Sequence, residues 1–170
     1  MPTDAEITYA DHVGRYYARR YAFPPMVGRL IGYLSVCEPR AQTIGELAEA
    51  LLASRSAITQ AVKMLETTQV ISRTRAAGER VDRVQIDFNS PSSQGLDVTE
   101  YVELGELARE GLEVLRDAPI ERRAVLLETV AYADFLVDRM QALQHEWTER
   151  LAELVADGTL PARDVAGGRW

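Results

Sequence analysis

The chain has 170 residues, of which 46% are hydrophobic and 26% are charged, and its formal net charge at pH 7 is −7. This length and composition fit a folded protein with a core of ordinary size and exclude a largely disordered chain. The acidic start, Met1-Pro-Thr-Asp-Ala-Glu6, does not resemble a signal peptide, and the apolar run from Leu30 to Cys37 is too short to span a bilayer. We therefore expect a cytoplasmic protein without a membrane partner.

Residues 1–38 predict two helices that support the rest of the chain. The first spans Ala5 to Ala22, and the second runs from Pro25 to about Val36, because proline is tolerated in the first turn of a helix. Five of the seven tyrosines lie in this region: Tyr9, Tyr16, Tyr17, Tyr21 and Tyr33. They permit a cage for a cationic ligand, although tyrosines on amphipathic helices usually pack in a core or a dimer interface.

Residues 39–88 contain the most informative pattern. Thr43 and Glu46 form a capping box, which starts a short helix, and Ser54 is placed to cap a second helix that runs to about Glu66. The apolar residues of the first helix have amphipathic spacing: Ile44, Leu47, Ala48 and Leu51. A short turn through Leu52 joins the two helices, so the segment predicts a helix-turn-helix.

The second of these helices has two different faces. Its apolar face consists of Ile58, Ala61, Val62 and Leu65, and its polar face consists of Arg55, Ser56, Thr59, Gln60 and Lys63. Arginine pairs with guanine, glutamine with adenine, and hydroxyls with phosphates or bases, so this face, together with Ser54, suits the major groove of double-stranded DNA. The alternative interpretation is an ordinary solvated helix face.

A basic hairpin follows directly. Val70–Arg75 and Val84–Phe88 alternate as strands do, and the segment between them holds Gly78. We expect a β-hairpin with Arg80 and Arg83 near its tip. A hairpin of this kind can insert an arginine into the narrow minor groove, so Arg75, Arg80 and Arg83 are further candidates for DNA contact.

The remainder of the chain predicts a linker and two long helices. Asn89–Gly95 is rich in turn residues, and helices are expected from Asp97 to Arg116 and from Glu121 to about Val155. The last helix carries a heptad-like apolar stripe: Leu126, Val130, Ala133, Val137, Met140, Trp147, Leu151 and Leu154, interrupted by Gln144. This stripe packs either within a helical hairpin or between two chains of a dimer.

These patterns divide the chain into five parts: N-terminal helices at 1–38, a winged helix-turn-helix head at 39–88, a linker at 89–95, a helical dimerisation region at 96–157 and a flexible tail at 158–170. Charge is segregated among them. Residues 40–86 hold seven Lys or Arg against five Asp or Glu, whereas residues 87–157 hold six against sixteen. An acidic body behind a mildly basic head orients the head toward DNA, which reconciles DNA binding with a pI near 4.9.

The chain resembles the multiple-antibiotic-resistance-regulator (MarR) superfamily, and in particular its GbsR-like branch. The residues that carry the resemblance are Gly28–Leu34 (GRLIGYL), Glu46–Leu51 (ELAEAL), Ser54–Thr59 (SRSAIT) and Gly78–Arg80 (GER), and it covers roughly residues 5 to 155. In one departure, Thr67-Thr-Gln-Val70 stands where such proteins usually have glycine after the recognition helix. A non-glycine residue in a left-handed cap costs on the order of 1 kcal/mol, so we expect this helix to end differently.

The resemblance implies a mainly α fold with a small β-hairpin wing and with long N- and C-terminal helices that form a homodimer. It implies a transcriptional regulator, expected to be a repressor, that binds a pseudo-palindromic operator in double-stranded DNA. It also implies a small-molecule effector between head and base, with Tyr16, Tyr17 and Tyr21 as candidates for the wall of its site.

Enzymatic residues are sparse. His12, His145 and Cys37 form no constellation, and no phosphate-binding glycine loop or metal-ligand pair appears, so we expect no enzyme, no metal and no cofactor. The single cysteine, Cys37, excludes an internal disulfide and fits a buried structural thiol better than a redox sensor. The remaining alternative is a winged helix that binds protein as an anti-activator, whose recognition face would be apolar or acidic.

Overall fold

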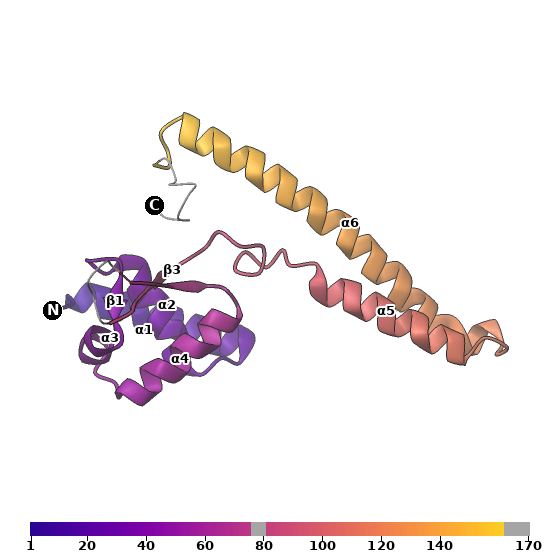
Figure 1. Cartoon of the computed structure of the whole chain (residues 1–170), viewed down its shortest axis with the longest axis horizontal. Coiled ribbons are helices and arrows are strands. Elements are labelled where there is room, and N and C mark those ends of the chain that lie inside the picture. Colours follow the sequence, from indigo (N-terminus) through magenta and orange to yellow (C-terminus); the bar gives the residue numbers. More distant parts are fainter. Residues whose placement is uncertain (76–80, 162–170) are drawn as a thin grey trace. The chain divides into compact units, whose positions relative to one another are not determined.

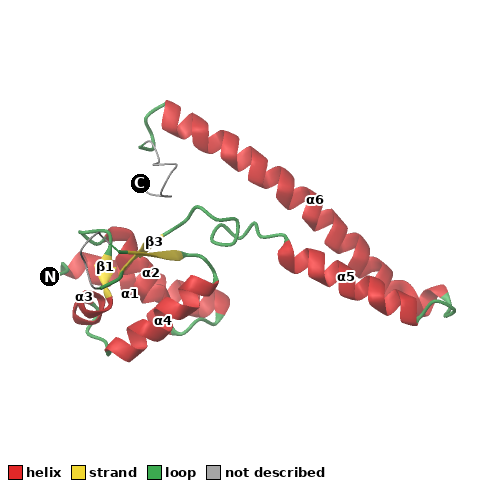
Figure 2. Cartoon of the chain, in the orientation of Figure 1, coloured by secondary structure: helices red, strands yellow, loops and turns green. Residues whose placement is uncertain are grey.

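A computed structural model describes residues 1–75 and 81–161 and shows a mainly helical chain with a three-stranded antiparallel sheet (Figures 1 and 2). It forms two compact units, Met1–Ser93 and Gln94–Trp170. The first unit contains α1 (Asp4–Tyr21), α2 (Pro25–Val36), β1 (Gln42–Thr43), α3 (Ile44–Ala50), α4 (Arg55–Thr67), β2 (Ile71–Thr74) and β3 (Arg83–Ile86). The second contains α5 (Thr99–Val114) and α6 (Ile120–Ala156). The predicted fold class is confirmed, and the tail expected at 158–170 lies mostly outside the described residues.

Glycines bring α1 and α2 into backbone contact. A Cβ atom added to Gly28 would lie 2.8 Å from the Cα of Gly14, and one added to Gly32 would lie 2.8 Å from the Cα of Ala10. Real Cβ atoms do not approach other atoms so closely, so only glycine fits where these two helices cross. The helix pair is therefore fixed by the absence of side chains at its crossing point.

Helix α2 is the centre of the first unit. Seven of its twelve residues are buried, and it contacts α1, α4 and β3. The largest fully buried side chains of the unit come from α2 itself, α3 with its cap Leu51, α4 and β3: Leu30, Leu47, Leu51, Ile58, Val62, Leu65 and Val84. Each such side chain contributes about 1.5–3 kcal/mol when fully buried. The predicted apolar face of α4 is thus confirmed as its core face.

The sheet has the strand order β1-β3-β2, with both pairs antiparallel. Strands β2 and β3 form the predicted hairpin, and β1, which pairs Gln42 with Val84, was not predicted. A strand of two residues is too short to show an alternating pattern.

Both capping signals of the helix-turn-helix are confirmed. The amide of Glu46 donates to Thr43 Oγ1 at 3.1 Å, and the Thr43 amide donates to the Glu46 carboxylate at 2.7 Å. Ser54 Oγ accepts from the Ala57 amide at 3.1 Å, which caps α4. These bonds satisfy amides that have no partner inside their helices.

The expectation that α4 ends differently without a glycine is wrong. Gln69 adopts the left-handed conformation, with φ of 55°, that glycine usually takes. The Val70 amide donates to the Leu65 carbonyl at 3.0 Å and the Gln69 amide donates to the Glu66 carbonyl at 3.1 Å. This is the Schellman pattern, in which the two bonds offset the strain of a left-handed glutamine.

In the second unit, α5 and α6 pack on each other as a helical hairpin. The predicted stripe of α6 is only partly covered, and Ala133 is its one buried residue along this fully described helix. A second apolar row stays exposed on one side of α6: Val125, Tyr132, Phe135 and Leu143. Gln144, which interrupts the stripe, donates to the Leu96 carbonyl at 2.6 Å. None of the helices in the described ranges is long and apolar enough to cross a membrane.

The glycine crossing generates a stability prediction. Replacing Gly32 with Ala forces the new methyl group against Ala10 and against Val13 Cβ, which would lie at 2.9 Å. Such overpacking should lower the free energy of unfolding by about 1–3 kcal/mol. The control is Gly45→Ala in α3, where the nearest atom would lie at 3.6 Å, and it should stabilise by about 0.5–1 kcal/mol. Urea unfolding that gives both variants the same stability would contradict the packing account.

Candidate nucleic-acid interface

The face of α4 opposite the core is polar and exposed. Ser54, Arg55, Ser56, Gln60 and Lys63 are exposed on it, and Thr59 is half-buried. The hydroxyls are tied to the helix, because Ser56 Oγ lies 3.0 Å from Ser54 Oγ and Thr59 Oγ1 donates to the Arg55 carbonyl at 2.8 Å. The structure therefore brings together all six sequence-predicted residues of this helix on one surface.

Three of these side chains are available for an external partner. The side chains of Arg55, Gln60 and Lys63 have no hydrogen-bond or ion-pair partner among residues 1–75 and 81–161. An exposed arginine, amide and lysine without internal partners can bind a ligand without first breaking a contact within the protein. Glu66, the remaining long polar side chain of α4, is instead paired with Arg73 of β2.

The arginines of the hairpin are different, because each described one faces a carboxylate. Arg75 Nε donates to Asp82 Oδ1 at 2.7 Å, and this hydrogen bond lowers the pKa of the Asp82 carboxyl. Arg73, which the sequence analysis did not select, forms a two-bond pair with Glu66 of α4, one bond at 3.2 Å. This pair fastens β2 to the end of α4. Arg80 lies outside the described residues.

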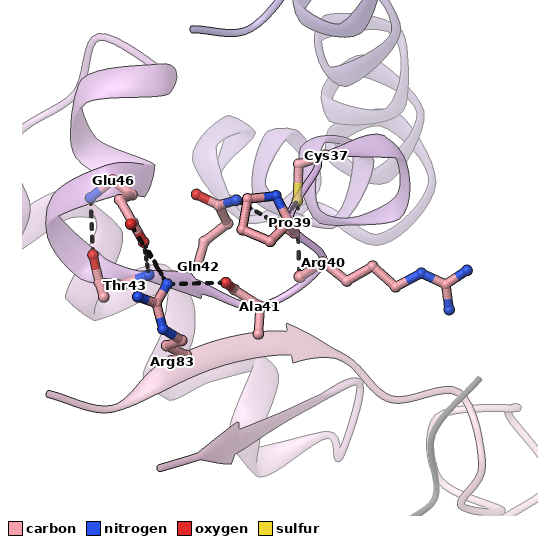
Figure 3. Close-up of polar contacts among 8 residues, drawn as sticks. All are labelled: Cys37, Pro39, Arg40, Ala41, Gln42, Thr43, Glu46 and Arg83. Atoms are coloured by element: carbon pink, nitrogen blue, oxygen red, sulfur yellow. Dashed lines mark hydrogen bonds and ion pairs between the residues drawn. The ribbon is translucent and has the colours of Figure 1, made fainter. Parts of the chain in front are cut away.

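Arg83 was expected near the hairpin tip, and the structure corrects this position. It is the first residue of β3, where it pairs with Thr74 of β2 and Thr43 of β1. Its guanidinium donates to the Glu46 carboxylate at 3.0 Å and to the Ala41 carbonyl at 3.3 Å (Figure 3). Arg83 thereby connects the sheet to the start of α3.

The same region shows how Glu46 and Cys37 are held (Figure 3). The Thr43 amide, with a smaller contribution from Arg83, lowers the pKa of the Glu46 carboxyl, so this carboxylate stays ionised opposite Arg83. Cys37 is buried as predicted, and burial raises the pKa of its thiol to about 11. Its Sγ lies 3.5 Å from the Pro39 carbonyl. A neutral, buried thiol is a poor nucleophile, which agrees with a structural role.

A second feature of the first unit is a mainly apolar groove of about 560 Å³, here named the α1 groove. Its wall consists of Tyr9, His12, Val13, Tyr16, Tyr17, Ile31, Ser35, Val70, Ile86, Phe88 and Ser93. Two of the three predicted effector residues, Tyr16 and Tyr17, are therefore in it, and Tyr21 is not. Tyr21 instead contacts Tyr17 and Phe23 at ring-centre distances of 5.6 and 5.7 Å.

Another hollow of about 590 Å³ lies beside α3 and is lined by four carboxylates, Glu6, Glu38, Glu46 and Glu49. Carboxylates repel phosphate, so this hollow is no part of a nucleic-acid surface. No group of three or more His, Cys, Asp or Glu in the described ranges is arranged to hold a metal ion.

Comparison with known proteins identifies the family. Residues 97–150 match the family of MmpR5-like MarR family transcriptional regulators. The chain is 34% identical over 121 residues to the HTH-type transcriptional regulator MmpR5 of Mycobacterium tuberculosis (strain ATCC 25618 / H37Rv), which covers 71% of this chain and 73% of that protein. It is also similar to a crystal structure described as a transcriptional regulator, with 28% identity and a TM-score of 0.75 over 85% of this chain and 99% of the other.

These matches agree with the winged helix-turn-helix of the first unit and with the helical hairpin of the second. They do not confirm the finer resemblance to the GbsR-like branch, since the matched family is described as MmpR5-like. The family consists of transcriptional regulators and not of enzymes. The chain therefore belongs to the MarR family of transcriptional regulators.

Proposed function

We propose that the protein is a homodimer that binds a pseudo-palindromic operator in double-stranded DNA through α4, with the β2–β3 hairpin as a wing. The observation that carries this proposal is the surface of α4, whose core face is buried and whose Arg55, Gln60 and Lys63 side chains have no partner in the described residues. A protein-binding winged helix, the alternative, would present an apolar or acidic face at this position.

The composition of the α4 surface supports reading of bases as well as binding of phosphates. Arginine and glutamine form paired hydrogen bonds with guanine and adenine in the major groove, while Ser54, Ser56 and Thr59 lie near the N-terminal turn of the helix. The amides of a helix N-terminus favour phosphate oxygens. In this arrangement the amides and hydroxyls at the start of α4 meet the DNA backbone, and the long side chains of Arg55 and Gln60 reach base edges.

Replacing a base-reading residue should therefore change specificity. We expect Gln60→Ala or Arg55→Ala, whichever side chain contacts a base, to weaken binding to the preferred site by about 1–3 kcal/mol and to relax the preferred sequence. Selection from random duplexes supplies the preferred site, and repeating it with each variant measures the relaxation. Gln141→Ala and Arg122→Ala, at exposed positions of α6, are matched controls that should behave as wild type.

Failure of the wild-type protein to enrich any duplex at low salt would contradict sequence-specific binding and favour the protein-binding alternative. If Gln60→Ala and Arg55→Ala both retain the wild-type affinity and the wild-type preferred sequence, α4 is not the recognition helix.

The wing should contribute affinity more than specificity. Arg75 and Arg83 are each paired with a carboxylate. A phosphate that binds either arginine must compete with that ion pair, so the net gain in binding free energy is small. We propose Arg80, which lies between β2 and β3 in the sequence, as the main cation of the wing.

Arg80→Ala should weaken binding to preferred and scrambled duplexes alike, because a contact to phosphate carries no sequence information. The slope of log affinity against log salt should become shallower by about one unit. Titrations over a range of salt measure this slope, with Arg122→Ala as the control. An unchanged affinity and slope would remove Arg80 from the interface.

The exposed apolar row of α6 supports the homodimer. Val125, Tyr132, Phe135 and Leu143 lie on one side of a 37-residue helix and repeat at nearly heptad spacing, as in helices that pair with another helix. A second copy of the chain offers the same row and can cover it. Two recognition helices related by two-fold symmetry would then occupy half-sites about 10–10.5 base pairs apart.

Light scattering should therefore report about twice the mass of the 19.0 kDa chain. Phe135→Glu places a charge in the row and should shift the mass toward the monomer, whereas Arg122→Glu should not. A wild-type monomer at micromolar concentration would contradict the dimer.

Effector control is the remaining part of the proposal. The volume of the α1 groove and its mainly apolar wall with several tyrosines support this groove as the effector site. Tyr21 contacts Tyr17 but is not part of the wall. We propose a cytoplasmic repressor that releases DNA when a small molecule occupies this groove, and placement in the GbsR-like branch stays a prediction. A compound that raises the melting temperature of the wild type but not of a Tyr16→Ala variant, without lowering DNA affinity, would count against release.

A further inference from the structure

Arg29 of α2 joins three elements of the first unit. Its Nε donates to Asp11 Oδ1 of α1 at 2.6 Å, and its Nη1 donates at 3.3 Å to the carbonyl of Leu51, which caps α3. The side chain of Arg29 is only 24% exposed, so it is held along the protein and does not project into solvent. We infer that Arg29 is a positioning residue through which α1 sets the turn of the helix-turn-helix and hence the start of α4.

The path of the Arg29 side chain is built into α1. A Cβ atom added to Gly14 would lie 2.8 Å from Arg29 Cγ and 3.2 Å from the Pro25 carbonyl oxygen. Gly14 therefore leaves room for the arginine stem, and Asp11, three residues earlier on the same side of α1, receives its head. The absence of a side chain at Gly14 and the carboxylate of Asp11 thus together accommodate Arg29.

The other end of the link lies in the turn itself. The Leu51 carbonyl is at the C-terminal end of α3, where carbonyls lack helical partners and a cation is favoured. The next residue, Leu52, has φ of 50° and is 94% exposed, so its side chain does nothing to hold the turn. Only two residues separate Leu51 from Ser54, the cap of α4, so a displacement of the turn moves the start of α4.

The opposite side of α1 faces the α1 groove. At 100° per residue, His12, Val13 and Tyr16 lie across the helix from Asp11 and Gly14. A molecule in the groove that displaces α1 would therefore pull on Asp11, on Arg29 and on the turn. This regulation rests on the proposed function, and it requires that the molecule bind the two positions of α1 with different affinities.

The test distinguishes the role of the two hydrogen bonds of Arg29, to Asp11 and to the Leu51 carbonyl, from the role of its charge. Arg29→Lys keeps the charge and the stem, but a lysine ammonium lacks the fork that reaches Asp11 and Leu51 together. Arg29→Met keeps the packing beside Gly14 and removes both contacts. Arg122→Met and Arg122→Lys, on an exposed position of α6, are the matched controls.

We expect both Arg29 variants to bind the duplex selected by the wild type about tenfold more weakly, with an unchanged slope of log affinity against log salt. Hydrogen exchange at the amides of Leu52 and Ala53, which donate to the carbonyls of Glu49 and Ala48, should be about tenfold faster. Exchange at Val62, in the core of α4, should stay as in the wild type. The double variant Arg29→Lys with Asp11→Asn should lose less DNA affinity than the product of the fold-losses of the two single variants.

Three results would overturn the inference. A salt slope shallower by about one unit would make Arg29 a phosphate contact. Wild-type affinity and turn exchange in both variants would leave Arg29 without a positioning role. Equal acceleration at Val62 and at the turn would show only a loss of overall stability.

The proposed function and the positioning role of Arg29 can be contradicted independently of each other. If Arg29→Met does not fold, Arg29→Lys and Asp11→Asn carry the test. If the wild type selects no duplex, the proposed function fails, while exchange at Leu52 and Ala53 still decides whether Arg29 holds the turn.

Discussion

The contact between α1 and α2 is the constraint on which the first unit depends. Gly28 and Gly32 place the backbone of α2 directly against α1, so α2 is enclosed and its remaining sides must bury side chains from α4 and β3. Because α4 gives its whole apolar face to this core, its polar face is turned to solvent. The packing around α2 therefore leaves the polar face of α4 exposed to solvent, and no further contact is needed to hold α4 in this orientation.

Pairing of charges separates the basic residues of α4 from three described arginines of the hairpin. The arginine and lysine of α4 have no partners in the described residues, whereas Arg73, Arg75 and Arg83 are each paired with a carboxylate. The paired arginines brace the hairpin against α4 and α3, so their charge is partly used within the fold. A small net positive charge in the head and a strongly acidic remainder then favour binding that depends on specific contacts more than on bulk attraction.

Features set by neighbouring residues were predicted from the sequence, and features set by distant ones were not. Thr43, Ser54 and Pro25 mark helix starts through contacts within about four residues, and the structure confirms all three. Other features depend on contacts between residues far apart in the sequence, which no local pattern contains. They are strand β1, the pair between Arg83 and Glu46, and the groove residues Val70 and Ile86. The ending of α4 was predicted wrongly because its hydrogen bonds tolerate a left-handed Gln69. Contacts between two copies of the chain stay a prediction.

We expect α4 to be the surface that meets DNA. Hydrogen exchange of the full chain, measured with and without a duplex selected from random sequences, tests it without any substitution. If α4 meets DNA, the duplex should slow exchange across residues 54–63, with smaller effects in the hairpin strands β2 and β3. Slower exchange confined to other parts of the chain, with residues 54–63 unaffected at saturating duplex, would contradict it.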